Sequence, residues 1–443
     1  MGRLEPGIHS GRLSPAEYEK NFSELHPVFS DHEALVASDR CYFCYDAPCM
    51  TACPTSIDVP LFIRQISTGN AMGAAKTIFD QNIMGGMCAR VCPTETLCEQ
   101  ACVRNTAEER PVEIGRLQRF ATDKAMHAGK QFYTRPASIG KSVGVVGAGP
   151  AGLAAAHRLA INGFDVTVYD HREKAGGLNE YGIATYKATD DIAQKEADYI
   201  LSVGGIDVLD GEMLGRDFTL ADLKAKHDAV FLGVGLGGVN ALTVEGTHEF
   251  GVVDAVEFIA NLRQADAKGD VPVGRRVVVI GGGMTAVDAA VQAKLLGAEE
   301  VTMCYRRGQE HMNASLYEQE LAASKGVLIR HWLAPKSVSS HGGHVTGMTL
   351  AYTHLENGLL KETGQTLEIA CDQILTAIGQ TLDIAGLDTI KVEKGKIVID
   401  EEGRTSVAGV WAGGDCATGG EDLTVSAVAM GRDAAMSIIK ALA

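Results

Sequence analysis

The sequence predicts an α-helical, cysteine-rich domain followed by two α/β domains, the second inserted in the first. Three observations predict this organisation. Eight of the eleven cysteines lie between Cys41 and Cys102. Two segments, beginning at Val143 and Arg276, each show a buried strand, a glycine-rich turn and a helix. The length of 443 residues suggests two to four domains.

The composition excludes several classes of function. The hydrophobic content is 46% and no uninterrupted apolar run approaches about 18 residues, so we expect no membrane span and no membrane partner. The formal net charge of −16 argues against a nucleic-acid partner, because phosphate binding requires a basic face. The N-terminus, MGRLEPGIHS, lacks the apolar core of a signal peptide, and the isolated Cys304, Cys371 and Cys416 are predicted to be reduced core thiols. We therefore expect a cytoplasmic protein.

The clustered cysteines form two runs whose crowding indicates a metal centre. The first run holds four ligand candidates and the second holds three: Cys41, Cys44, Cys49 and Cys53, then Cys92, Cys98 and Cys102. Disulfides need an oxidising compartment, and zinc prefers two pairs with two to four residues inside each. Iron–sulfur clusters need four ligands each, and a cysteine-rich run that ends in Cys-Pro is typical of them. Iron–sulfur clusters are the favoured interpretation, with disulfides and zinc as the alternatives.

The cysteines are expected to lie on a helical domain, residues 1–140. The pattern from Ile57 to Ala128 is helical, and helices can hold the cysteine loops rigidly. We expect residues 1 to about 40 to pack on this domain. The stretch from Gln131 to Gly140 is a short linker.

The first glycine fingerprint follows the linker. A strand over 143–146 leads into a turn and a helix through Leu159, and a second strand, 166–170, ends at Asp170. In such units the glycines serve the tight turn, the approach of the backbone to a pyrophosphate and helix–strand packing, while the acid binds the adenosine ribose. The predicted cofactor contacts are Gly147, Gly149, Pro150, Ala151, Gly152 and Asp170.

The second fingerprint predicts a second dinucleotide site. A strand over 276–280 precedes the turn, a helix runs through Leu296, and the next strand covers 301–304. The predicted contacts are Gly281, Gly283, Met284, Thr285 and Ala286. Where the first unit has Asp170, this one has Tyr305 followed by Arg306 and Arg307, and arginines here suit the 2′-phosphate of NADP(H).

Two further motifs assign the cofactors. The segment that contains Gly177 and Leu178 resembles the second glycine pair of flavoproteins of the disulfide-reductase type. The segment 410–415 resembles the motif whose aspartate holds the flavin ribityl chain, and the helix near Thr424 and Val425 would direct its N-terminus at the flavin. We therefore expect Gly414 and Asp415 to contact FAD. The predicted FAD-binding domain covers 141–255 and 372–443, and the NAD(P)H-binding domain covers 256–371.

The cysteine region resembles the N-terminal domain of dihydropyrimidine dehydrogenase. The text from Arg40 to Pro54, the text around Cys92 and Cys98, and residues 113–118 carry the resemblance. It implies two [4Fe–4S] clusters with ligands that cross between the runs. One cluster would take Cys41, Cys44, Cys49 and Cys102, and the other Cys53, Cys92, Cys98 and the side-chain oxygen of Gln118. Cys88 fits no ligand position and is predicted to be a small buried residue.

The resemblance extends over nearly the whole chain and implies an electron-input subunit, similar to the bacterial PreT type. Such a subunit passes electrons from NAD(P)H through FAD and the clusters to a partner. The implied partner is an iron–sulfur subunit that contains FMN, binds the pyrimidine and reduces uracil or thymine to the 5,6-dihydro compound in pyrimidine catabolism. No acid/base pair is required, so we name no catalytic residue.

Several alternatives stay open. Similar builds occur in the small chain of glutamate synthase and in ferredoxin–NADP reductases, and a non-catalytic assembly subunit is a third possibility. The choice between NADH and NADPH is also open, because Asn313 stands where animal dehydrogenases have a further basic residue. The segment 183–186, Ile-Ala-Thr-Tyr, departs from the Ile-Pro and Phe of relatives, in a loop that lies near the flavin in that family.

Overall fold

The structure is a computed structural model that describes residues 5–443. The chain forms two compact units. The first comprises Met1–Leu25, Tyr181–Thr189 and Val239–Gln380, and the second comprises His26–Glu180, Asp190–Gly238 and Thr381–Ala443. Both cysteine runs and the first fingerprint therefore lie in the second unit, and the second fingerprint lies in the first.

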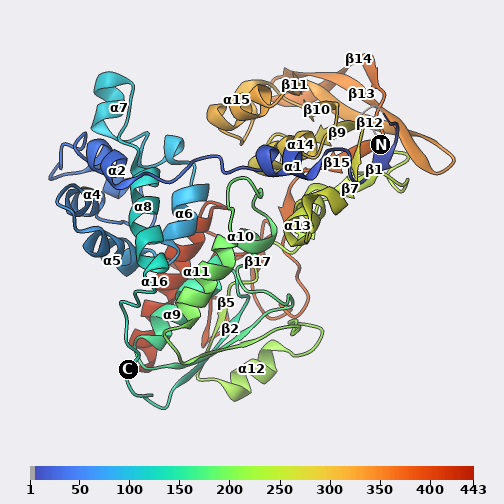
Figure 1. The fold of residues 1–443 in the computed structure, drawn as a ribbon. Coiled ribbons are helices and arrows are strands. Elements are labelled where there is room, and N and C mark those ends of the chain that lie inside the picture. Colours follow the sequence, from blue (N-terminus) through green and yellow to red (C-terminus); the bar gives the residue numbers. More distant parts are fainter. Residues whose placement is uncertain (1–4) are drawn as a thin grey trace. The chain divides into compact units, whose positions relative to one another are not determined.

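Short helices carry the cysteines of the second unit. They are α2 (Asp31–Ser38), α3 (Pro48–Thr51), α4 (Val59–Ser67), α5 (Ala71–Gln81), α6 (Gly85–Val91), the 3₁₀ turn η1 (Thr94–Thr96), α7 (Val103–Glu108) and α8 (Ile114–His127). Side-chain caps begin several of them, as where Asp58 accepts the N–H of Leu61. Phe62, Ile78 and Leu117 form their apolar core. Figure 1 shows α4 and α5 beside the long α8.

A parallel sheet of five strands forms the rest of the second unit, in the order β19-β5-β2-β3-β4. The strands of this sheet and the helices and short strands around it are β2 (Ser142–Val146), α9 (Pro150–Ala160), β3 (Asp165–Tyr169), α10 (Leu178–Tyr181), α11 (Ile192–Leu201), β4 (Ile206–Leu209), α12 (Leu220–Lys226), β5 (Ala229–Leu232), β17 (Val392–Glu393), β18 (Lys396–Ile397), β19 (Val410–Ala412) and α16 (Thr424–Leu442). Strands β17 and β18 pair with each other outside the five-stranded sheet. Leu153 of α9, Ile200 of α11 and Val428 of α16 enter the same core as the cysteine helices. The cysteine helices and this sheet therefore share one hydrophobic core.

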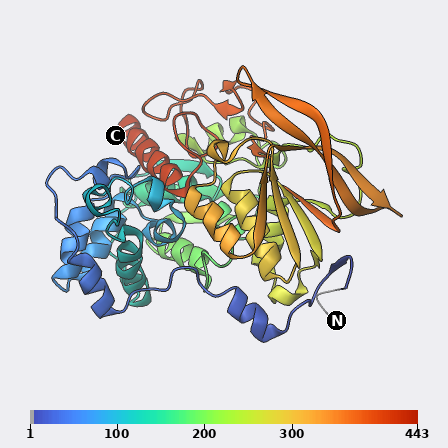
Figure 2. The same ribbon diagram turned by 90° about the horizontal axis from the view of Figure 1, so that it is seen from above.

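The first unit is built on a second parallel sheet, in the order β11-β10-β9-β15-β7. Its elements are β7 (Val252–Asp254), α13 (Ala255–Gln264), η2 (Lys268–Asp270), β8 (Val273–Gly274), β9 (Arg276–Ile280), α14 (Met284–Leu295), β10 (Glu300–Tyr305), η3 (Gln309–His311), α15 (Leu316–Ser324), β11 (Val327–His331) and β15 (Gln373–Thr376). Three long antiparallel strands form a separate sheet between β11 and β15 in the chain: β12 (Leu333–His341), β13 (His344–Glu356) and β14 (Leu359–Ile369). Figure 2 shows these strands in orange.

The N-terminal segment belongs to the first unit. Strand β1 (Ile8–His9) pairs antiparallel with β8, and α1 (Pro15–Asn21) follows it. Tyr18 of α1 is buried and its hydroxyl donates to the carbonyl of Leu296. The expectation that residues 1 to about 40 pack on the cysteine helices is therefore wrong for Ile8–Asn21, and residues 1–4 lie outside the described chain. The apolar partners of Tyr18 and Leu13 are residues of the sheet and helices around the second fingerprint.

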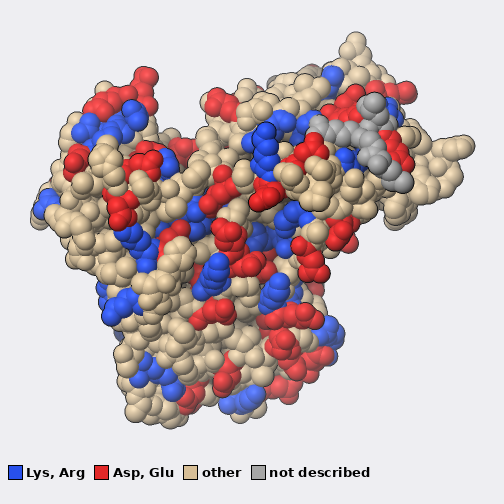
Figure 3. Space-filling view, in the orientation of Figure 1, with Lys and Arg blue, Asp and Glu red and all other residues tan. Residues whose placement is uncertain are grey.

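The chain passes between the units shortly after β5 and again shortly after β15. Strands β5 and β15 lie inside their own sheets, and the unit boundaries follow at Gly238 and Gln380, within β6 (Gly238–Val239) and β16 (Gln380–Thr381). The three-domain division and its bounds stay a prediction. None of the helices in the described chain is long and apolar enough to cross a membrane. On the face shown in Figure 3, Lys and Arg side chains are interspersed with Asp and Glu.

Candidate redox-cofactor sites

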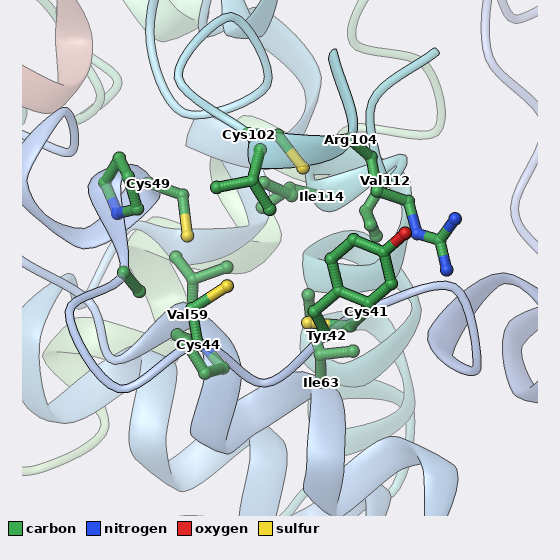
Figure 4. A pocket seen from close by; sticks show the side chains of 14 residues that line it. Cys41, Tyr42, Cys44, Cys49, Val59, Ile63, Cys102, Arg104, Val112 and Ile114 are labelled. Carbon is green, nitrogen blue, oxygen red and sulfur yellow. The ribbon is translucent and has the colours of Figure 1, made fainter. Parts of the chain in front are cut away.

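Four cysteines of the first predicted ligand set line one pocket. Cys41 and Cys44 lie in the loop after α2, Cys49 lies on α3, and Cys102 caps the N-terminus of α7. Figure 4 shows the four sulfur atoms around the pocket. The pocket is partly open to solvent. Its remaining lining is mainly apolar, with Val59, Ile63, Val112 and Ile114 among its members.

The pKa values of two of these thiols are raised by burial and by the neighbouring cysteines. Burial, together with the neighbouring Cys102, Cys41 and Cys44, raises the pKa of Cys49 to about 12. Burial also raises the pKa of Cys41, while the N–H of Phe43, which donates to its sulfur, lowers it. Metal clusters bind thiolates, so cluster binding would release these protons. Among residues 5–443, no three His, Cys, Asp or Glu side chains converge on a position for a single metal ion.

The second predicted set brings together thiols from both runs. Cys53 follows α3, Cys92 ends α6 and Cys98 follows η1. The pKa of Cys92 is raised well above its usual value by a hydrogen bond with Cys88, by burial and by the nearby Cys98 and Cys53. Cys88 is buried, and the isolated Cys304, Cys371 and Cys416 are buried free thiols, as predicted.

Gln118 lies on the buried side of α8. Its side chain is 8% exposed, and its Nε2 donates to the carbonyl oxygen of Gly85 over 2.7 Å. This bond engages the amide nitrogen, so the oxygen is the atom left to act as a ligand. Whether that oxygen binds a cluster stays a prediction.

The first fingerprint has no room for side chains at two of its glycines. Gly147 has φ +98°, and a Cβ there would lie 2.3 Å from the carbonyl oxygen of Gly233. A Cβ on Gly152 would lie 1.8 Å from the carbonyl oxygen of Gly147. A Cβ on Gly177 would lie 2.7 Å from the Cα of Gly149, so the second glycine pair closes against the fingerprint turn. These glycines therefore permit the tight turn and the close packing of backbone on backbone that a dinucleotide-binding fingerprint requires.

Asp170 fixes this turn with both carboxylate oxygens. Its Oδ2 accepts the N–H of Ala148 over 2.6 Å, and its Oδ1 accepts the N–H of Arg172 over 2.8 Å. A carboxylate has about four acceptor positions, so it can still accept ribose hydroxyls. Contact with the ribose stays a prediction, while the support of the turn is a role that sequence reasoning missed.

The C-terminal motif meets the same turn. A Cβ on Gly414, which has φ +80°, would lie 3.0 Å from the side chain of Ala151. A Cβ on Gly431 of α16 would lie 2.0 Å from the carbonyl oxygen of Ala151, so α16 and α9 pack in close contact. Burial raises the pKa of Asp415 to about 6, and Asp422 raises it while Lys396 lowers it. Thr424 begins α16, and its hydroxyl donates to Asn179 Oδ1 over 2.9 Å.

The second fingerprint lies at the start of α14. A Cβ on Gly281 would lie 2.3 Å from the carbonyl oxygen of Ala377, whereas Gly283 has no atom within 4 Å of its Cβ position. Open space at Gly283 suits the approach of a pyrophosphate to the backbone. Met284, Thr285 and Ala286 form the first turn of α14.

Arg306 and Arg307 follow β10. Arg306 is exposed and Arg307 is half-buried, and within residues 5–443 neither guanidinium group has a hydrogen bond or ion pair. Their backbones are held: the hydroxyl of Thr353 donates to the carbonyl of Arg306 over 2.8 Å, and the N–H of Trp332 donates to the carbonyl of Arg307 over 3.2 Å.

The segment Tyr181–Thr189 also lies in the first unit, which the sequence did not predict. Lys187 Nζ lies 2.8 Å from Asp288 Oδ1 and 2.8 Å from Glu318 Oε1. The hydroxyl of Tyr186 donates to Asp288 over 3.0 Å. The partners are more than a hundred positions apart in the chain, so no local pattern signals this network.

Comparison with known proteins places these features in a family. Residues 18–130 match the model described as dihydropyrimidine dehydrogenase domain II, 4Fe–4S cluster, and residues 141–431 match pyridine nucleotide-disulphide oxidoreductase. The NAD-dependent dihydropyrimidine dehydrogenase subunit PreT of Salmonella typhimurium is 34% identical over 417 residues, 94% of this chain and 96% of the relative. The NADPH glutamate synthase small chain of Escherichia coli is 32% identical over 443 residues, 94% of this chain and 93% of the relative.

Solved structures agree with the fold of the two parallel sheets. Thioredoxin reductase of T. acidophilum has a TM-score of 0.54 at 24% identity, and the match covers 68% of this chain and all of that one. FprA of Mycobacterium tuberculosis has a TM-score of 0.59 at 19% identity and covers 68% of this chain and 84% of that one. The prediction of a helical N-terminal region followed by FAD- and NAD(P)-binding Rossmann-like α/β domains is confirmed.

Proposed function

Because the chain belongs to the pyridine nucleotide-disulphide oxidoreductase family and is similar to PreT and to the glutamate synthase small chain, we propose that it is the electron-input subunit of a dihydropyrimidine dehydrogenase. In this proposal NAD(P)H is the electron source, FAD and two [4Fe–4S] clusters carry the electrons, and an FMN-containing, pyrimidine-binding partner reduces uracil or thymine. The carrying observation is that both thiol sets and the FAD-type fingerprint belong to one compact unit with a shared core.

The thiol sets fit the two clusters. The pocket among Cys41, Cys44, Cys49 and Cys102 would hold one cluster, and its open mouth suits transfer of electrons to a partner. Cys53, Cys92 and Cys98 with the oxygen of Gln118 would hold the other. A neutral amide in place of a thiolate leaves a cluster with less negative charge, which changes its reduction potential.

A short chain of contacts links the proposed flavin site with the Gln118 set. Thr424, at the start of α16, bonds to Asn179, whose Nδ2 lies 3.9 Å from the sulfur of Met84. Met84 precedes Gly85, whose carbonyl accepts the amide of Gln118. The contacts support a direct passage of electrons from the flavin site into this ligand set.

A second link runs through Arg432 of α16. Its Nη1 donates to the carbonyl oxygens of Thr55 and Gln81, over 2.8 and 2.9 Å. The hydroxyl of Thr55 lies 3.3 Å from the sulfur of Cys53. The helix that would face the flavin therefore also fixes the loop of a proposed cluster ligand.

The two fingerprints fit different nucleotides. Gly147, Gly149, Gly152 and Gly177 would admit the pyrophosphate of FAD, and Asp415 would hold its ribityl chain. Gly281, Gly283 and the first turn of α14 would hold the nicotinamide dinucleotide. Bound FAD would supply hydride acceptance and one-electron transfer, and the protein's part is to orient the rings and exclude water.

Anaerobic reduction of the purified holoprotein tests the proposal. The protein is mixed with NADH or NADPH, its visible absorbance is followed, and uracil is added in a second arm. We expect flavin and clusters to bleach without turnover of uracil, and uracil to be consumed once the FMN-containing partner is added. Uracil reduction by this chain alone would place the substrate site here and refute the subunit role. Absence of bleaching with both nucleotides would favour the non-catalytic assembly subunit.

A glutamate synthase type of electron-input chain is the second candidate, because that small chain is 32% identical over 94% of this chain. Electron delivery to a glutamate synthase large subunit, but not to an FMN-containing pyrimidine subunit, would favour it.

A further inference from the structure

We propose that Thr353 of β13 and Trp332, which precedes β12, are positioning residues that hold Arg306 and Arg307 for recognition of a 2′-phosphorylated dinucleotide. The inference rests on the proposed nicotinamide site at the second fingerprint. It adds a role for a sheet that contains none of the fingerprint residues.

The passage of the chain from the parallel sheet to the antiparallel sheet lies beside the turn that contains the two arginines. In β10 and β11, Tyr305 is in register with His331, so the two strands end side by side. Trp332 then joins β11 to β12, and Arg306 and Arg307 follow β10. The turn after β10 and the start of the antiparallel sheet therefore meet at one edge, the carboxyl edge where parallel sheets bind ligands.

Trp332 is held in an unfavourable backbone conformation at this junction. Its φ is +61°, in the left-handed region that bulky residues rarely adopt. Its N–H donates to the carbonyl of Arg307, and its carbonyl accepts the N–H of Thr353 over 2.9 Å. A strained residue persists only where its surroundings fix it, and such residues gather at ligand sites.

Thr353 reaches the turn because β13 is irregular there. The pairing of β13 with β14 shifts register between Ala351 and Thr353. Irregularities of this kind redirect a side chain, and they are frequent beside active sites. Thr353 is 5% exposed, and its hydroxyl donates to the carbonyl of Arg306. Two backbone carbonyls in succession are thereby fixed by one junction.

The fixed backbone contrasts with the unpaired side chains. Within residues 5–443 no carboxylate or carbonyl engages the guanidinium of Arg306 or Arg307, so both groups stay available to an anion. A guanidinium binds phosphate best through two parallel hydrogen bonds, which require a defined orientation. A loose turn would spread the two groups over many orientations and weaken binding of the phosphate without affecting NADH.

The test compares NADPH and NADH as electron donors to ferricyanide, with the holoprotein. Thr353→Val removes the hydroxyl and keeps the shape. We expect the KM for NADPH to rise about fivefold, the equivalent of one ordinary hydrogen bond, with the KM for NADH and both kcat values within twofold of wild type. Thr353→Ser keeps the hydroxyl and should restore the NADPH value. Thr366→Val, at an exposed position of β14 in the same sheet, is the matched control.

The outcomes separate this inference from the proposed function. An equal rise of both KM values in Thr353→Val, or no change in either, would overturn the positioning role. Arg306→Gln and Arg307→Gln should lower the preference for NADPH. If they do and Thr353→Val does not, only the inference fails. If neither arginine variant changes the ratio of the two KM values, the assignment of the arginines fails and the positioning role fails with it.

Discussion

Removal of the buried Lys187 ammonium should unfold the first unit at a much lower temperature. Lys187 is about 9% exposed and lies between Asp288 on α14 and Glu318 on α15. Burial alone would lower its pKa, but the two carboxylates outweigh burial and hold the pKa above its usual value. Lys187 is therefore charged at every pH up to its own unfolded pKa, and its contribution to stability is lost only as the pH rises through the higher pKa of the folded state.

Lys187→Met leaves two buried carboxylates without their cation. Removal of one partner from a buried ion pair typically costs about 3–5 kcal/mol. For units of about 150–250 residues each kcal/mol lowers Tm by about 2–4 °C, so the variant should melt roughly 6–20 °C below wild type.

Thermal melting followed by circular dichroism measures the effect. Lys336→Met, at an exposed position of β12, is the control and should melt within 2 °C of wild type. Lys187→Met/Glu318→Gln should recover part of the loss, because one of the two stranded charges is gone. A Tm for Lys187→Met within 2 °C of wild type, or a double variant less stable than the single one, would refute the reasoning.

Three further predictions concern the second unit and the fingerprints. Gln118→Ala should lose the iron of one cluster and its reduced-state spectrum; unchanged iron content and spectrum would remove Gln118 from the ligands. Gly431→Ala should purify with less FAD and a lower Tm, because its Cβ would lie 2.0 Å from the carbonyl oxygen of Ala151. Gly283→Ala, whose Cβ would meet no atom within 4 Å, should keep its Tm and bind the nicotinamide dinucleotide more weakly. Equal Tm values for the two variants would contradict this prediction. Burial raises the pKa of Glu196 from near 4.5 to about 8, partly offset by the N–H groups of Met87 and Gly86. The folded state then holds more protons than the unfolded state, so stability should fall between about pH 5 and pH 8, and Glu196→Gln should flatten that fall in urea unfolding; an unchanged slope would contradict the assignment.

The features that were predictable from the sequence are those whose physical cause is local. Gly147 and Gly281 were identified because a turn at the end of a buried strand leaves no room for a Cβ, and the structure shows a carbonyl 2.3 Å from each Cβ position. The strand over 276–280 was predicted at its observed bounds, because the run of valines is typical of a strand buried on both faces. The turn, the strand and the helix that follows are neighbours in the chain, so periodicity and glycine spacing suffice to find them.

The features that the sequence did not indicate depend on contacts between distant segments. Nothing near Lys187 shows that Asp288 and Glu318 will surround it. Likewise, Ile8–Asn21 precedes the cysteine helices in the chain, yet this segment belongs to the first unit, where β1 pairs with β8. Proximity in sequence is a weak guide here, because the partners of this segment are β8 and the apolar cluster around Tyr18, both distant in the chain.

The proposed crossing of cluster ligands explains why the cysteine region consists of such short helices. Cys49 lies on α3, which has four residues, and Cys102 precedes α7, which has six. Isolated helices shorter than about 12 residues are marginal in water, so neither would persist from its own hydrogen bonds. A cluster that joins Cys41, Cys44 and Cys49 to Cys102 would tie both helices to one rigid centre, and metal-binding free energy then becomes folding free energy. The longer α8, which carries Gln118, packs on the shared core by itself, so the two ligand sets would differ in how strongly they depend on iron for their shape.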